Sequence, residues 1–335
     1  SAGERVRDRT SGRPLSHDDY RAAVRSRMAD LDRLSPLPAG AGRPVSVASG
    51  SDGAPDPAAE LVPDERLIVA LDVDGTILDV NGRVSERMMA ALTRMRAYGA
   101  RIVISTGRGI EAALPVARHV GLTDGWMICA NGAITLRMDP AAPRGYEVAD
   151  SVTFDPSDVI AALSSAVPDG IIAVEALDGG FRVSRPFPDG ELIEDQRVVP
   201  PQEMGSEPVT RVVLRAPGMA VEEFSALVAG CGLYSVEYAI GWTAWLDVAP
   251  EGVTKASALR ALAARLGTGA ERVVAVGDGA NDIEMIRWAG VGAVMGSAPR
   301  AVRDCGDLVT GPVWHDGCAA LLDAVVERTR RRSQS

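Results

Sequence analysis

Short, nearly continuous apolar runs alternate with amphipathic segments in two parts of this chain of 335 residues. A strand that is buried on both faces of a parallel sheet has this appearance, whereas a half-exposed strand alternates apolar and polar residues. The apolar runs occupy residues 67–71, 101–104, 126–129 and 272–276. Segments with a helical period accompany them, at residues 85–98, 109–120 and 254–266. This alternation predicts a doubly wound, Rossmann-like α/β core with a parallel sheet.

The middle of the chain has a different rhythm, because its apolar runs are short or alternate with polar residues. Such runs begin at Ile171, Phe181, Arg211 and Tyr234. They predict an inserted α+β domain whose sheet has one exposed face. We therefore expect a discontinuous core domain, residues 64–132 and 247–327, interrupted by a cap domain, residues 133–246.

Both ends of the chain lie outside this pattern. Residues 1–63 are predicted to be an extension, with stretches rich in Ser, Gly, Pro, Ala and Asp that are typical of a flexible linker. Within the extension, Ser16 is a candidate cap for a short helix with Tyr20, Val24, Met28 and Leu31 on one face. We expect this face to dock on the body of the protein or on another subunit. Residues 328–335 are interpreted as an arginine-rich tail that serves solubility.

An acidic turn follows the first apolar run, with the sequence Asp72-Val-Asp74-Gly75-Thr76. Open α/β sheets bind ligands at the carboxyl ends of their strands, which is where this turn is expected to lie. Two neighbouring carboxylates repel each other unless a cation or a shared proton relieves the repulsion. A solvated acidic turn and a calcium loop are the alternatives. The spacing does not fit the calcium pattern, and a strand rather than a helix precedes it.

Two further motifs also follow apolar runs. Ser105-Thr106-Gly107-Arg108 comes before a helix, where a hydroxyl and free backbone N–H groups can bind an anion, although an ordinary helix cap looks the same. Gly277-Asp278-Gly279-Ala280-Asn281-Asp282 places carboxylates after the last long run. This motif does not match the GxGxxG pattern of nicotinamide and flavin sites. Carboxylate and carbonyl oxygens without His or Cys are ligands suited to a hard cation such as Mg²⁺.

The chain has a single lysine, Lys255, among 35 basic residues. Surface ion pairs accept either basic residue, so a strong bias toward arginine acts freely there. Lysine is a compact point charge, whereas arginine is a flat fork. Lys255 is therefore a candidate for a position that requires an ammonium group, with chance survival on a surface helix as the alternative.

Along the chain the four motifs are the acidic turn, the Ser105 motif, Lys255 and the Gly277 motif, and in this order they resemble those of the haloacid dehalogenase superfamily phosphatases. The resemblance covers about residues 66–326 and is closest to the Cof-type branch (class IIB), which carries a large C2 cap after the third core strand. Smaller agreements are Asn131-Gly-Ala133 at the end of that strand and the residues leading into Lys255. The resemblance implies a phosphoric monoester hydrolase that acts on a small phosphorylated metabolite, with sugar phosphates as the commonest substrates.

The resemblance also implies roles for individual residues. Asp72 would be the nucleophile that forms an aspartyl-phosphate, and Asp74 would act first as the general acid and then as the general base. Lys255 would bridge Asp72 and the phosphate.

The remaining motif residues would bind the cofactor and the phosphate. The resemblance implies Mg²⁺ on Asp72, the Asp74 carbonyl and Asp278, with Asp282 in support. Phosphate would be bound by Ser105, the loop residues Thr106 and Gly107, and Lys255, with the Thr106 N–H as one donor. Asn281 would orient Lys255 or the phosphate.

Two other functions remain open: a phosphomutase of the same superfamily, and a non-catalytic binding or scaffolding protein. Dehalogenation is excluded by the resemblance, because the dehalogenases lack the acid found here at Asp74. A pump ATPase is excluded by the absence of membrane spans. In the cap, Arg182 and Arg185 could meet an acidic substrate or form surface salt bridges, and Glu175 has no readable role.

Composition limits the binding partners and the cellular compartment that are expected for this protein. A formal net charge of −10 argues against nucleic acid or an anionic membrane as a partner. The four cysteines are widely separated, which fits free thiols rather than disulfides or a zinc site. No apolar run is long enough to cross a bilayer or to form a signal peptide core. The expected location is the cytoplasm, and the oligomeric state is left open.

Overall fold

The computed structural model describes residues 15–35, 61–176, 179–234, 236–241 and 243–334. The chain forms two compact units, one of residues 1–103 and 260–335 and one of residues 104–259. The predicted linker stretches fall mostly within residues 36–60, outside the described residues. No helix in the described part of the chain is both long and apolar enough to span a membrane.

The first unit contains a parallel sheet built on the predicted apolar runs. Its strands lie in the order β14 (Leu308–Val309), β13 (Val291–Val294), β12 (Val273–Gly277), β1 (Ile68–Leu71) and β2 (Arg101–Ser105). β1 pairs in parallel with β12, with Leu71 opposite Val276. This register brings the residues that follow both strands, Asp72 and Asp278, to the same edge of the sheet.

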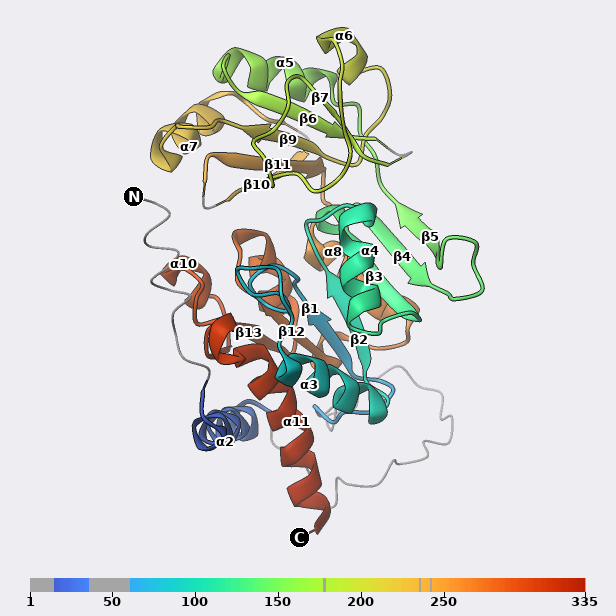
Figure 1. The fold of residues 1–335 in the computed structure, drawn as a ribbon, viewed down its shortest axis with the longest axis vertical. Helices are drawn as coiled ribbons and strands as arrows, with labels where there is room; N and C mark the ends of the chain where they lie inside the picture. The colour runs from blue at the N-terminus through green and yellow to red at the C-terminus, as the bar shows by residue number, and fades with distance from the viewer. Residues whose placement is uncertain (1–14, 36–60, 177–178, 235, 242, 335) are drawn as a thin grey trace. The chain divides into compact units, whose positions relative to one another are not determined.

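Helices α3 (Glu86–Ala97) and α11 (Gly317–Gln334) lie in front of the strands of this unit in Figure 1. α3 begins where predicted, because the Ser85 hydroxyl accepts a hydrogen bond from the Met88 N–H at 3.0 Å. Its buried residues recur at helical spacing from Met88 to Met95. The shorter elements of the unit are η2 (Ala270–Arg272), η3 (Ala280–Asp282), α9 (Ile283–Trp288), α10 (Arg300–Arg303) and η4 (Val313–His315).

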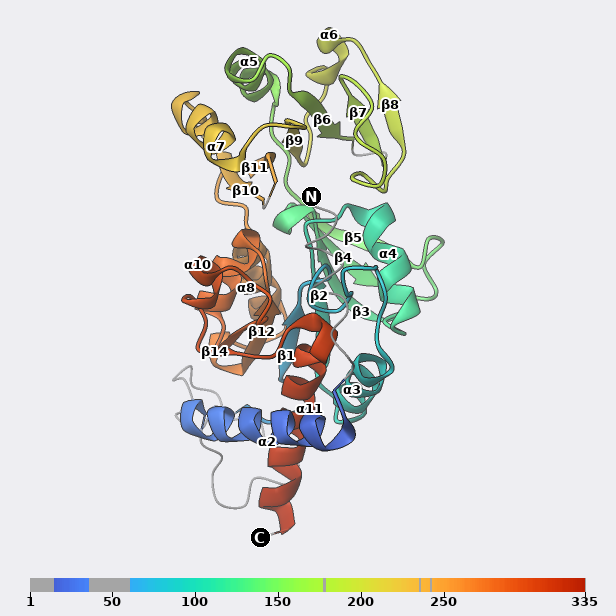
Figure 2. The same ribbon diagram turned by 60° about the vertical axis from the view of Figure 1, so that its left-hand side comes forward.

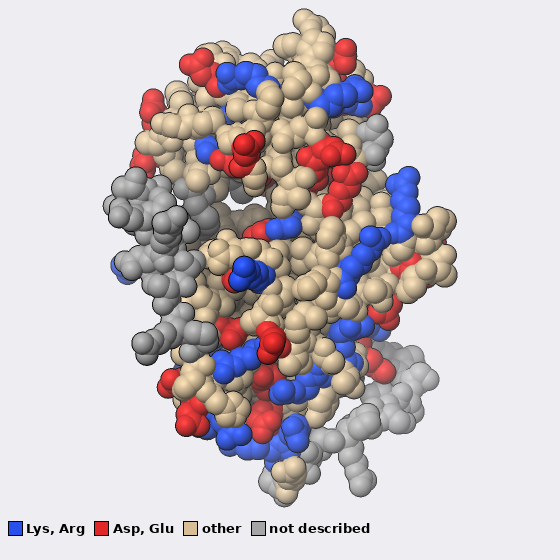
Figure 3. Space-filling view, viewed as in Figure 1, with Lys and Arg blue, Asp and Glu red and all other residues tan. Residues whose placement is uncertain are grey.

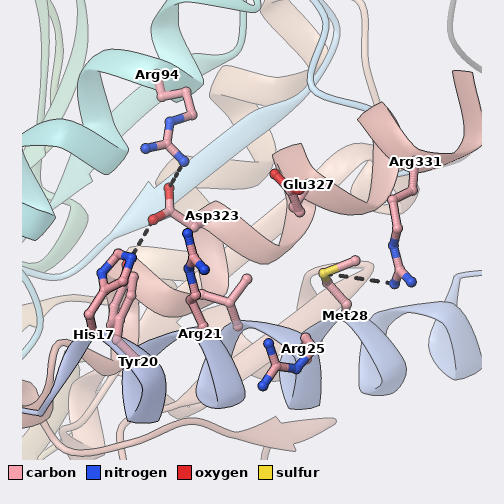
Figure 4. A pocket seen from close by; sticks show the side chains of 10 residues that line it. His17, Tyr20, Arg21, Arg25, Met28, Arg94, Asp323, Glu327 and Arg331 are labelled. Atoms are coloured by element: carbon pink, nitrogen blue, oxygen red, sulfur yellow. Dashed lines mark hydrogen bonds and ion pairs between the residues drawn. The ribbon is translucent and has the colours of Figure 1, made fainter. Parts of the chain in front are cut away.

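Helix α2 (His17–Leu34) docks on α11, which confirms docking on the body of the protein. Ser16 caps α2 as predicted, and of the predicted face Tyr20, Met28 and Leu31 are buried while Val24 is partly buried. The Tyr20 hydroxyl donates a 2.8 Å hydrogen bond to Asp323 of α11, and Arg94 of α3 forms an ion pair with the same carboxylate at 2.9 Å. Figure 4 shows these groups at one end of a pocket between the helices.

The predicted basic tail is instead the last part of α11. The Arg328 side chain is buried, forms an ion pair with Asp32 of α2 at 3.0 Å and donates to the Ser35 carbonyl. The prediction of a solvated tail is wrong here, because the sequence does not distinguish a buried, ion-paired arginine from an exposed one.

The second unit continues from the end of β2 through β3 (Gly125–Cys129), β4 (Ile134–Met138) and β5 (Tyr146–Ser151), with helix α4 (Ile110–His119) after β2. β3–β4 and β4–β5 are antiparallel. The predicted cap boundary at residue 133 is therefore wrong, because β4 and β5 extend the same sheet. Their antiparallel pairing lies outside the buried parallel pattern from which the core was predicted.

The cap sheet follows in the order β10 (Val236–Ile240), β11 (Trp245–Pro250), β9 (Val212–Arg215), β6 (Ile171–Glu175), β7 (Phe181–Val183) and β8 (Gln196–Val198). Since β11 belongs to this sheet, the predicted return to the core at residue 247 is also too early. The core resumes with α8 (Lys255–Arg265).

Both faces of the cap sheet are covered near its centre. Helices α5 (Ser157–Ala166) and α7 (Val221–Gly230), labelled in Figure 2, pack on one face. Their buried residues Leu163 and Phe224 belong to one core cluster, to which the short α6 (Pro201–Met204) adds Met204. On the other face, Phe187 and Leu192 pack against β6 and β7. The expectation of one exposed face is therefore wrong, because the loop between β7 and β8 folds back over the sheet.

Candidate active site

Three carboxylates meet at the edge of the sheet in the first unit. Asp72, Asp278 and Asp282 each place one carboxylate oxygen within 4.8 Å of the other two. Asp72 and Asp282 are buried, and Asp278 is partly buried. Like charges at this spacing repel in a region of low dielectric constant. The arrangement therefore fits a hard cation with oxygen ligands, as the residue types indicated.

Asp282 also fixes the loop that carries Asp278. Its Oδ2 accepts hydrogen bonds from the N–H groups of Asp278 at 3.0 Å and Gly279 at 2.9 Å. Any side chain at Gly277 would overlap the Asp282 carboxyl group. This geometry fits the supporting role expected for Asp282.

The turn after β1 is shaped by its backbone. The Val73 carbonyl accepts hydrogen bonds from three successive N–H groups, those of Thr76, Ile77 and Leu78. Gly75 has φ +81°, and a Cβ atom there would overlap the Asp278 carboxylate. Both the backbone conformation and the lack of space therefore require glycine. Asp74 is exposed on this turn, two residues after the buried Asp72. A buried acid and an exposed acid on one turn suit the different roles expected for them.

Ser105 and its loop belong to the second unit. The Ser105 side chain is fully buried, and its Oγ has no hydrogen-bond partner among the described residues. A buried hydroxyl without a partner is unfavourable unless a ligand satisfies it. The Thr106 N–H, by contrast, donates to the Ile128 carbonyl at 2.9 Å. The expectation that this N–H donates to a phosphate is therefore corrected, because it is already used next to β3.

The turn after β3 connects this loop to Lys255. The Asn131 N–H donates to the Thr106 carbonyl at 3.1 Å. Ala130, Asn131 and Gly132 all have positive φ, and a Cβ atom at Gly132 would overlap the Thr254 carbonyl. Lys255 follows at the start of α8 with 1% of its surface exposed. Backbone strain of this kind is often found at functional sites, and here it places the Asn131 turn directly against the residue before the lysine.

The cap contacts the same loop with residues that the sequence analysis did not identify. Arg211, just before β9, donates through Nη1 to the Gly107 carbonyl. The Gly109 N–H donates to the Glu194 carboxylate at 3.1 Å. Single residues at strand edges leave no local motif, so no pattern marked them. The sequence signal for a close approach at this loop was the glycine at position 109, since a Cβ atom there would overlap the Glu175 carboxylate.

The cap residues considered as substrate contacts have other partners. Arg182 forms an ion pair with Glu207 at 3.0 Å, and Arg185 donates to the Asp169 carbonyl at 2.5 Å. Arg182 therefore fits the salt-bridge alternative, whereas the contact of Arg185 is to a backbone carbonyl. Glu175, which had no readable role, is buried beside Arg211. Burial raises the pKa of Glu175, while the charge of Arg211 acts in the opposite direction.

The family model of haloacid dehalogenase-like hydrolases matches residues 69–166 and 219–322, which is more than half of the chain. The chain belongs to this family. The predicted superfamily and the predicted α/β fold class are thereby confirmed. The matched residues include the acidic turn, the Ser105 loop, Lys255 and the Asp278 loop.

Curated relatives of this hydrolase are named as phosphatases. A 5-amino-6-(5-phospho-D-ribitylamino)uracil phosphatase, YitU of Bacillus subtilis, is 25% identical over 76% of this chain and 96% of its own length. A phosphoglycolate phosphatase of Halobacterium salinarum is 27% identical over 77% of this chain and 96% of its own length. These names agree with the predicted enzyme class, a phosphoric monoester hydrolase.

Solved structures share the fold of the hydrolase. The subclass IIB sugar phosphatase BT4131 superposes with a TM-score of 0.65 at 24% identity, covering 76% of this chain and 96% of that chain. The phosphatase BT1666 from Bacteroides thetaiotaomicron has a TM-score of 0.63 at 24% identity, covering 83% of this chain and 99% of that chain. Both likenesses extend over about three quarters or more of the chain and show the shared fold.

Proposed function

We propose that this protein is a Mg²⁺-dependent phosphatase that hydrolyses a small phosphorylated metabolite, a sugar phosphate, through an aspartyl-phosphate intermediate on Asp72. The observation that carries the proposal is the meeting of Asp72, Asp278 and Asp282 within 4.8 Å beside a glycine turn. A bound cation would offset the repulsion between these carboxylates, which supports a metal site here.

The three carboxylates fit Mg²⁺, since all of their donors are oxygen atoms. Asp72 and Asp278 would hold the ion, together with the Asp74 carbonyl, and Asp282 would keep the Asp278 loop in place. The bound ion would neutralise charge on the transferred phosphoryl group.

The chain's own residues would carry the bond changes. The Asp72 carboxylate attacks phosphorus, and the leaving alcohol departs as Asp74 gives it a proton. Asp74 then takes a proton from the water that hydrolyses the aspartyl-phosphate, which restores both carboxyl groups.

Phosphate oxygens would be held by residues of the second unit. The Ser105 hydroxyl supports this role, because it is buried and lacks a partner among the described residues. Lys255 would supply the positive charge, and Gly107 lies on the same loop. Asn281, in η3 beside Asp282, would orient the lysine or the phosphate.

The surroundings of the reaction are also part of the proposal. The face drawn in Figure 3 carries acidic and basic side chains interspersed, without a continuous basic surface, which supports a small metabolite rather than nucleic acid as the partner. All four cysteines are free thiols, which fits the reducing cytoplasm.

A phosphate-release assay tests the proposal. The purified chain is screened with Mg²⁺ against sugar phosphates, phosphoglycolate and other phosphomonoesters, with EDTA and Asp72→Asn as controls. We expect release that needs Mg²⁺, is highest for a sugar phosphate, and is lost in Asp72→Asn while the circular dichroism spectrum is unchanged. Substantial activity in Asp72→Asn would refute the nucleophile assignment. A requirement for a bisphosphate activator without phosphate release would instead indicate a phosphomutase.

A further inference from the structure

A row of charged side chains crosses one face of the cap sheet. Glu175 ends β6, Arg211 precedes β9, and Asp247 lies in β11. The Arg211 Nε atom is 3.0 Å from Glu175 Oε2, and its Nη1 atom is 3.4 Å from Asp247 Oδ1. Glu175 and Arg211 are buried, and the Glu175 N–H also donates to the Arg211 carbonyl at 3.0 Å. One guanidinium thus holds two carboxylates in fixed positions.

This row contacts the Ser105 loop at two points on either side of Arg108. Arg211 Nη1 donates to the Gly107 carbonyl, and Glu194 accepts from the Gly109 N–H at 3.1 Å. The approach is close, because a Cβ atom at Gly109 would overlap the Glu175 carboxylate. The backbone that leads away from Ser105 is therefore held by cap side chains as well as by its own sheet.

We propose that Arg211 and Glu194 are positioning residues, which hold the loop from Ser105 to Gly109 in the shape that presents the Ser105 hydroxyl to phosphate. This inference rests on the proposed function, in which Ser105 binds phosphate. The contacts on the cap and the binding of phosphate then stabilise each other, because both favour the same loop conformation.

The three acceptors around position 211 favour arginine over lysine at this position. The side chain serves Glu175, Asp247 and the Gly107 carbonyl at once. A guanidinium has five N–H donors in a fixed plane, whereas an ammonium is a point charge that cannot span three acceptors in this way. Lysine at this position would keep the charge balance but lose part of the contact with the loop.

A matched set of variants tests the inference. Arg211→Lys and Glu194→Ala each remove a contact with the loop, and Glu194→Gln keeps an acceptor oxygen for the Gly109 N–H. Arg215→Lys is the control, because Arg215 lies at the end of β9 and pairs with Glu191 at 2.6 Å rather than with residues 105–109. Activity is measured with p-nitrophenyl phosphate, and the inhibition constant of inorganic phosphate is measured as a competitive inhibitor.

We expect Arg211→Lys and Glu194→Ala to lower kcat/KM and raise the phosphate inhibition constant by about 10-fold each, the usual effect of losing a hydrogen bond to a charged group. Glu194→Gln should recover most of the loss seen in Glu194→Ala. Arg215→Lys should stay within about 2-fold of the parent chain, because lysine keeps the charge opposite Glu191 and this pair does not involve residues 105–109.

Hydrogen–deuterium exchange of the loop peptide gives a second readout that needs no substrate. Exchange at Gly109 should be faster in Glu194→Ala than in the parent chain, Glu194→Gln or Arg215→Lys. The inference would be overturned if Arg211→Lys and Glu194→Ala had parental melting temperatures and changed neither the loop exchange nor the phosphate inhibition constant. If the parent chain releases no phosphate from any ester, the proposed function fails, and loop exchange alone decides whether the cap positions the loop.

Discussion

At the scale of single residues, Lys255 is the only lysine of the chain and one of its few buried charges. It begins α8 with 1% of its surface exposed, and its charge lowers the pKa of Asp247 against the dominant effect of burial, which raises it. A flat guanidinium does not fit where a compact ammonium is enclosed. The burial of the single lysine argues against its chance survival on a surface helix and supports the hypothesis that the shape of the cation matters at this position.

We therefore predict that Lys255→Arg lowers kcat/KM by at least about 100-fold, because misplaced charge stabilises the transition state poorly. The measurement is steady-state phosphate release with Mg²⁺. Arg265→Lys, the reverse change at the exposed end of the same helix, is the control and should leave kcat/KM unchanged. Near-parental kinetics for Lys255→Arg would show that only the charge at this position is needed.

The residues found from the sequence are those that occur in local motifs. Asp72, Asp278 and Asp282 follow apolar runs, and the parallel register of β1 and β12 brings them together. Arg211 and Glu194 could not be found in this way, because their partners at Gly107 and Gly109 are distant in sequence. Such contacts depend on how the inserted domain folds back onto the loop, which spacing along the chain does not encode.

At the scale of elements, two glycines with similar φ angles allow the cost of a positive φ to be measured apart from the cost of a steric overlap. Gly132 has φ +104° and Gly125 has φ +102°, but only Gly132 lies where a Cβ atom would overlap backbone, that of Thr254. We predict that Gly125→Ala costs about 1–2 kcal/mol of unfolding free energy from its positive φ. Gly132→Ala should cost about 1–3 kcal/mol more, because the Thr254–Lys255 segment must move.

Urea unfolding and kcat/KM of the two glycine variants check this prediction. Gly132→Ala should also lower kcat/KM, since the displaced segment carries Lys255, whereas Gly125→Ala should leave it unchanged. Equal stability and equal activity of the two variants would mean that the turn after β3 does not position the start of α8.

Most elements agree with the apolar periodicity, and the disagreements have one cause. β4 and β5 follow the last apolar run assigned to the core and were placed in the cap, although β4 pairs with β3 and β5 pairs with β4. In the same way, the loop that carries Phe187 and Leu192 covers a cap face that was expected to be exposed. Periodicity reports whether a strand face is buried, and it does not report which sheet the strand joins or what covers it.

At the scale of the whole molecule, the N-terminal helix α2 is part of the folded first unit rather than an appendage. It buries Tyr20, Met28 and Leu31, and its Asp32 pairs with the buried Arg328 of α11. The sequence predicted the helix and its docking face, because capping and helical spacing are local. It could not predict that the arginine-rich end of the chain supplies the opposite face.

Two leucines of α2 test whether this docking stabilises the protein. Leu31 is fully buried, whereas Leu34 is 37% exposed on the same helix. We predict that Leu31→Ala lowers the free energy of unfolding by about 2–5 kcal/mol, the usual cost of a buried leucine. Leu34→Ala should change it by no more than about 0.5 kcal/mol. Urea unfolding gives both values, and kcat/KM at a temperature where both variants are folded should stay parental. Equal, small losses would show that α2 contributes nothing to the stability of the first unit, whereas a large loss confined to Leu31→Ala ties the N-terminal helix to the fold that carries the acidic site.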